Sequence, residues 1–133
     1  MELTLDLILF SGAMTLVVVY LWFVSLLVVN ARVKYNIQPP KTSGNVDFEK
    51  IYRIQVNTYE ASILYLPLFT ILYLVSNGFI AAGAIILWLI ARVIYQLGYS
   101  KNVTSRTIGF RIQQVLFFVS VGLIVLYSVL FFL

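Results

Sequence analysis

The sequence predicts an all-α integral membrane protein, a left-handed four-helix bundle that forms one domain over residues 1–133. Hydrophobic residues make up 62% of the chain and charged residues only 11%, whereas soluble domains carry about 25% charged residues. The mean hydropathy is +0.99. Apolar runs of at least about 20 residues, enough for an α-helix to cross a hydrocarbon core, occur at four places. So little sequence remains outside these runs that we expect no soluble catalytic domain.

The expected spans follow one another through short connections. They cover about residues 5–31, 48–75, 79–99 and 107–133. The first ten residues, MELTLDLILF, carry Glu2 and Asp6 and no basic residue, which favours a retained span over a cleaved signal peptide. A polar loop over residues 32–47, with a Pro-Pro pair, joins the first two spans, and the Asn-Gly pair at residues 77–78 marks a tight turn.

The basic residues predict how these spans are oriented. All nine Lys and Arg residues lie beside the first and third connections, and none lies near a terminus or the middle turn. The positive-inside rule therefore predicts that both basic connections are cytoplasmic and that both termini lie on the opposite side. This asymmetry accounts for the net charge of +4, so we expect no nucleic-acid partner. An organelle membrane and a bacterial inner membrane both remain open.

Cysteine and histidine are absent from the sequence. Their absence excludes disulfides and a thiol nucleophile carried by the protein, and it argues against hydrolytic triads and zinc sites. We therefore expect no metal site. Any sulfur chemistry must come from a ligand.

The second expected span carries polar side chains on one narrow stripe. Each residue of an α-helix advances by about 100°, which places Glu49, Asn57 and Glu60 within about 40° of Arg53. Insertion scales assign about 2.5–3.5 kcal/mol to an ionised side chain at mid-membrane, and less near the boundary. Such side chains need a partner or a cavity. One interpretation is a structural ion pair between Arg53 and Glu60.

A second set of polar side chains lies on the third and fourth spans. Arg92, Tyr95 and Tyr99 share a stripe on the third span, and Arg106 adds a cation at the head of the fourth. Taken singly, such arginines often snorkel to lipid phosphates and such tyrosines often belong to an interfacial belt. Together with the stripe of the second span, they predict a pocket for a small zwitterion with more than one carboxylate.

Three motifs in the middle of the chain are distinctive in order and spacing: NARVKYNIQPP, FEKIYRIQVNTYE and ARVIYQLGYSKNVTSR. They resemble the MAPEG family, the membrane-associated proteins of eicosanoid and glutathione metabolism. The similarity is greatest to the branch of microsomal glutathione transferases and the cysteinyl-leukotriene synthase, and it covers about residues 30–110. The resemblance implies a homotrimer of four-helix subunits, with glutathione bound between adjacent subunits near the cytoplasmic side.

The resemblance also implies which residues form the glutathione site. The matching positions within one subunit are Arg53, Asn57, Glu60, Tyr95, Tyr99 and Arg106. Arg32 and Gln55 match positions that reach the site from the neighbouring subunit. Arginine forks suit the carboxylates of glutathione, and Glu60 suits its ammonium group. We expect Arg106 to be catalytic, because a nearby cation lowers the pKa of a thiol and only the thiolate attacks.

The function implied by the resemblance is glutathione transfer or glutathione-dependent peroxide reduction. Its substrates would be lipophilic electrophiles or lipid hydroperoxides that arrive from the bilayer. Val33 stands where the leukotriene synthase has its proposed proton donor, a second arginine, which disfavours leukotriene synthesis. Ala61 replaces a tyrosine of the leukotriene synthase and Ile63 replaces a proline of the family, and both substitutions affect the expected shape of the pocket. Two alternatives are a non-catalytic, lipid-binding scaffold of this family and a small proton-coupled exporter that uses Glu60 as its membrane carboxylate.

Overall fold

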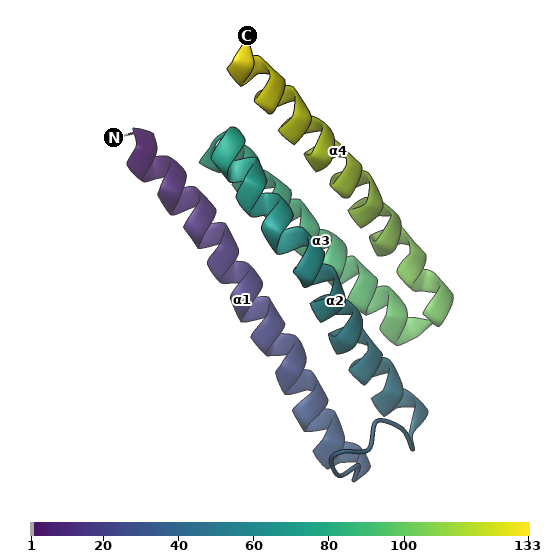
Figure 1. Cartoon of the computed structure of the whole chain (residues 1–133). Coiled ribbons are helices and arrows are strands. Elements are labelled where there is room, and N and C mark those ends of the chain that lie inside the picture. The colour runs from purple at the N-terminus through teal and green to yellow at the C-terminus, as the bar shows by residue number, and fades with distance from the viewer. Residues whose placement is uncertain (1) are drawn as a thin grey trace.

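The computed structural model describes residues 2–133 and contains helices without strands over that range (Figure 1). In chain order the elements are α1 (Glu2–Tyr35), α2 (Val46–Val75), α3 (Gly78–Lys101), the 3-10 turn η1 (Val103–Arg106) and α4 (Thr107–Phe132). The four α-helices are all long and apolar enough to cross a membrane. The prediction of an all-α chain with four helices able to span a membrane is therefore confirmed.

Helix α3 lies at the centre of the bundle. It contacts α1, α2, η1 and α4, whereas α1 and α4 do not contact each other within the described residues. Figure 1 shows α1 and α4 on opposite sides of the α2–α3 pair, with both termini at one end and the α1–α2 and α3–α4 connections at the other. Since α2 also contacts α4, the helices α2, α3 and α4 together form the side of the bundle on which most of the predicted site residues lie.

Helix α1 continues to Tyr35, beyond the end of the expected span. Its last turn contains Arg32 and Lys34, which interact favourably with the negative end of the helix dipole. Asn36 then adopts a φ of 52°, and the N–H of Ile37 donates to the carbonyl oxygen of Arg32 at 3.0 Å. The polar loop is therefore shorter than expected, because hydropathy marks where a helix leaves the apolar layer and not where the helix ends.

The interior and the outer faces of the bundle are both apolar. Phe69, Ile85 and Trp88 are fully buried where α2 and α3 pack together. On the outer helices, by contrast, Trp22 of α1 and Phe118 of α4 are 64% and 69% exposed. Acyl chains can cover such faces without the cost that water would impose, which agrees with helices that span a membrane.

Candidate functional site

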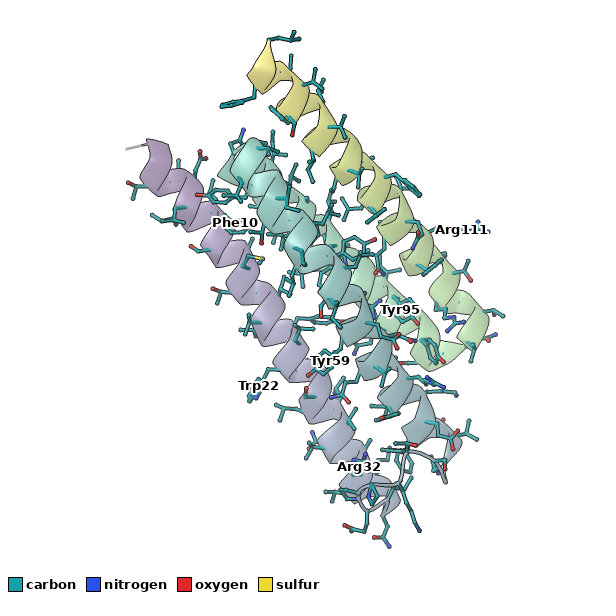
Figure 2. The ribbon with its side chains drawn as sticks, viewed as in Figure 1. Phe10, Trp22, Arg32, Tyr59, Tyr95 and Arg111 are labelled. Atoms are coloured by element: carbon teal, nitrogen blue, oxygen red, sulfur yellow. The ribbon has the colours of Figure 1, made fainter. Side chains whose placement is uncertain are left out.

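A pocket of about 460 Å³ lies between α2, α3 and α4. It is lined by Asn57, Glu60, Tyr95 and Arg106 from the predicted site, and by Ala61, Leu64, Tyr65, Arg92, Thr107, Phe110, Gln113 and Gln114. Figure 2 shows Tyr95 on α3, in the space between α2 and α4. The structure therefore brings together four of the eight predicted site residues.

Two glycines allow α4 to approach α3 closely enough to form this pocket. A Cβ atom on Gly109 would lie 2.5 Å from the backbone nitrogen of Tyr95, and one on Gly98 would lie 2.5 Å from the carbonyl oxygen of Ser105. Any other residue at these positions would force the two segments apart. The close contact places Arg106 beside the end of α3.

At the end of the pocket nearest the α3–α4 connection, the polar side chains come from three helices. Asn57 Nδ2 donates to the Tyr95 hydroxyl at 2.8 Å. The Arg106 Cζ atom lies 5.1 Å from the centre of the Tyr99 ring, so Tyr99 contacts the site through Arg106 rather than by lining the pocket. Among the described residues, Arg106 has no hydrogen-bond or ion-pair partner, and it occupies the N-cap position at the positive end of α4. Its guanidinium is available to an anion.

Glu60 and Arg53 do not form the ion pair that one interpretation of the sequence proposed. Within residues 2–133 the ion pair of the structure joins Lys50 and Asp47, at 3.3 Å. Glu60 is exposed and lines the pocket, whereas Arg53 is exposed on α2 and does not line it. The Glu60 carboxylate is therefore open to a cationic group of a ligand.

The two residues predicted to act from a neighbouring subunit lie outside the pocket of their own chain. Arg32 sits at the loop end of α1 (Figure 2), where its Nη1 donates to the carbonyl oxygens of Ile37 at 3.3 Å and Lys41 at 2.8 Å. Its Cζ atom lies 5.2 Å from the centre of the Phe48 ring. Gln55 is half-buried on α2. Arg32 thus holds the α1–α2 loop within its own subunit.

Arg92 is a lining residue that the sequence placed on a polar stripe with Tyr95 and Tyr99 but that was not among the predicted glutathione-site residues. It is 2% exposed, and its Nη2 donates to Thr58 Oγ1 at 2.5 Å while its Nη1 donates to Gln113 Oε1 at 3.3 Å. Its Cζ atom lies 4.3 Å from the centre of the Tyr95 ring. A signal was present in the sequence, because Arg92 lies within about 60° of the predicted site residue Tyr95 on the same helix.

The polar side chains that line the pocket suit an organic zwitterion. It offers two guanidinium groups, one carboxylate, three side-chain amides and two phenols. The described residues include no group of three His, Cys, Asp or Glu side chains that could hold a metal ion. Glu60 can bind an ammonium group while Arg106 binds an anionic group of the same molecule.

Comparison with known proteins identifies a family and several relatives that match part of the chain. The model of the MAPEG family matches residues 10–126. An uncharacterized protein of Synechocystis sp. is 39% identical over 80 residues, which are 60% of this chain and 58% of that protein.

Two further relatives have named activities. Leukotriene C4 synthase of Bos taurus is 39% identical over 88 residues, which are 63% of this chain and 56% of the synthase. Microsomal glutathione S-transferase 2 of Bos taurus is 33% identical over 104 residues, which are 75% of this chain and 64% of the transferase. The chain thus spans a little over half the length of the curated relatives that it matches.

Proposed function

We propose that this chain, which belongs to the MAPEG family, is a membrane-bound glutathione transferase that activates the glutathione thiol for attack on lipophilic substrates. One observation carries the proposal. A cation, Arg106, and a carboxylate, Glu60, neither of which has an ion-pair partner within residues 2–133, line the same pocket in a bundle of four helices able to span a membrane. The relatives named as a glutathione transferase and a leukotriene synthase support the choice of glutathione as the ligand.

The binding groups of glutathione match the charges of the pocket. Glu60 pairs with the ammonium group, while Asn57 and Arg53 hold the carboxylates through charge-assisted hydrogen bonds. The exposure of Arg53 and Glu60 on α2 supports a site that a second subunit completes. In this proposal the protein is a homotrimer, Arg32 and Gln55 of one subunit reach the glutathione of the next, and the site faces the cytoplasm.

Arg106 is the proposed catalytic residue. Its guanidinium and the positive end of α4 lie together, and both favour a thiolate over a thiol. The thiolate then attacks an electrophilic carbon, a sulfur–carbon bond forms, and the leaving group departs with its electron pair. Binding both reactants in one pocket supplies the proximity that speeds this step. Lipid hydroperoxides are a second substrate class, because the same thiolate reduces them.

The test is the thiolate absorbance that appears when purified protein is mixed with glutathione at neutral pH. We expect a signal from the wild type and none from Arg106→Ala, with the oligomeric state of the variant unchanged. Arg111→Ala is the matched control, because Arg111 is exposed on α4 and does not line the pocket, and it should retain the signal. Absence of both the signal and calorimetric glutathione binding in the wild type would refute the proposal.

A further inference from the structure

Arg92 is a buried cation for which the described residues supply no anion. It is 2% exposed, its side-chain acceptors Thr58 Oγ1 and Gln113 Oε1 are both neutral, and the neutral Tyr20 hydroxyl also lies beside it. Its Nε has no hydrogen-bond partner within the described residues. A guanidinium has five N–H groups; Arg92 lines the pocket, and its Nε–H is buried and left without a partner among the described residues.

A structural role alone accounts poorly for this arrangement. Removing a charge from water costs several kcal/mol per ion unless it is paired, and neutral acceptors repay only part of that cost. An ionisable residue inside a membrane bundle therefore indicates a function, with the missing partner supplied by a ligand. For Arg92 that partner must be an anion, or an atom on which negative charge develops during a reaction.

The position of Arg92 indicates which anion this is. Gln113, its hydrogen-bond partner, lies two helical turns beyond Arg106, about 10 Å along the axis of α4. A thiolate held by Arg106, the two oxygens of a peroxide and a hydrogen bond to a second cation together span a similar length. Phe110 lies one helical turn beyond Arg106 and lines the pocket together with Leu64, so the pocket also offers apolar surface to a neutral, lipophilic molecule.

We propose that Arg92 is a second catalytic residue, which binds the oxyanion released from a lipophilic hydroperoxide. This inference rests on the proposed function, because the attacking sulfur is the glutathione thiolate. It adds an oxyanion site at the membrane end of the pocket, opposite the thiolate site at Arg106. The site favours hydroperoxides over other electrophiles. Their reduction places the negative charge on a single oxygen atom, which the Arg92 N–H groups can stabilise by hydrogen bonds.

The step is balanced with glutathione as the reductant. The thiolate attacks the terminal oxygen of the hydroperoxide, so a sulfur–oxygen bond forms and the O–O bond breaks. The sulfur is oxidised to a sulfenic acid and the peroxide is reduced to an alkoxide, which Arg92 stabilises through hydrogen bonds until it takes a proton from water. A second glutathione thiol then converts the sulfenic acid to glutathione disulfide, releasing water.

The decisive variant is Gln113→Glu, which supplies Arg92 with a carboxylate at nearly the same position and shape. The new carboxylate would form an ion pair with the Arg92 guanidinium and would keep the contact of Arg92 with α4. We expect hydroperoxide reduction to fall by about 100-fold, the size of effect seen when one oxyanion donor is lost. The thiolate signal and the conjugation of 1-chloro-2,4-dinitrobenzene should stay within about threefold, because charge spreads over the arene and needs no single donor.

Two further variants separate this role from general effects. Gln114→Glu adds the same charge at an exposed position of the pocket wall that has no bond to Arg92. It should lower hydroperoxide reduction by less than about fivefold. Arg92→Lys keeps the charge but loses the planar fork, and it should lower the ratio of hydroperoxide to arene turnover by at least about tenfold.

The outcomes are distinct from those of the proposed function. A wild type without a thiolate signal would refute the proposed function itself. A normal thiolate signal in Gln113→Glu together with an unchanged ratio of hydroperoxide to arene turnover would refute only the role of Arg92. Equal losses of both activities in Gln113→Glu, with a lower thermal midpoint, would assign Arg92 a structural role and overturn the inference.

Discussion

The α1–α2 and α3–α4 connections lie at the same end of the bundle, and each presents an arginine that the family pattern assigns to glutathione (Figure 1). At the first connection, Arg32 donates to two loop carbonyl oxygens and lies over Phe48. At the second, Arg106 lies over Tyr99 without a hydrogen-bond partner among the described residues and lines the pocket. Arg32 and Arg106 are both predicted to bind glutathione, yet their surroundings in the structure differ.

The difference suggests a rule: an arginine whose N–H groups already donate to nearby protein acceptors supports the structure, whereas one whose N–H groups are free can bind a ligand. Backbone carbonyls already use part of the hydrogen-bonding capacity of Arg32, so its removal should mainly affect the loop. Arg106 has its capacity free at a helix N-terminus, where the helix dipole also favours an anion. We therefore expect thiol activation at the α3–α4 connection, and loop support with a smaller contribution to glutathione binding at the α1–α2 connection.

The largest expected effect comes from Gly109, which allows the α3–α4 connection to form. A Cβ atom there would lie 2.5 Å from the Tyr95 nitrogen and 2.6 Å from the Ala91 carbonyl oxygen. Gly109→Ala should therefore destabilise the protein by about 1–3 kcal/mol, as overpacking does, and should abolish the thiolate signal. Thermal unfolding in detergent measures the first effect.

Gly122→Ala is the control on the same helix, because no atom lies within 4 Å of the added carbon. It should leave the thiolate signal intact and raise helix stability by up to about 1 kcal/mol. Equal behaviour of the two variants would show that close packing of α3 and α4 does not build the site.

Glu60 tests whether the pocket beside the α3–α4 connection binds the ammonium group of glutathione. Glu60→Gln keeps the shape of the side chain but removes the anion that pairs with the ammonium group of glutathione. Its glutathione affinity should fall by about tenfold, which corresponds to about 1.4 kcal/mol, while the bound ligand is still converted to thiolate. Isothermal titration calorimetry gives the affinity, and an unchanged value would assign the ammonium group to another residue.

The smallest expected effect is at Arg32. Arg32→Ala removes two hydrogen bonds and a ring contact from the loop, with a net cost of about 1 kcal/mol. Limited proteolysis within residues 36–45 should accelerate, and glutathione should bind a few-fold more weakly. At saturating glutathione the thiolate signal should be retained. A complete loss of that signal would mean that Arg32, not Arg106, activates the thiol.

The fold was largely predictable because hydropathy and length decide where a chain can cross a bilayer. Helical periodicity also brought Asn57 and Glu60 to one face of α2 and Tyr95 to a matching face of α3. It placed Arg53 on the same stripe, although Arg53 does not line the pocket. A helical wheel describes one helix and does not specify which neighbour covers each part of its face.

Contacts between distant segments could not be predicted in this way. The hydrogen bonds of Arg92 to Thr58 and Gln113 join three helices, so they depend on how the bundle packs. The bonds of Arg32 depend on the conformation of the loop after Asn36, whose φ is 52°. In both cases the residue type was visible in the sequence, and its partner was set by tertiary structure.

The most direct test of the central claim is an experimental structure of the protein with glutathione bound. Our account predicts the tripeptide in the pocket between α2, α3 and α4, with its sulfur against the Arg106 guanidinium and its ammonium group against Glu60. Glutathione bound elsewhere, with Glu60 turned toward acyl chains or paired with Arg53, would contradict it.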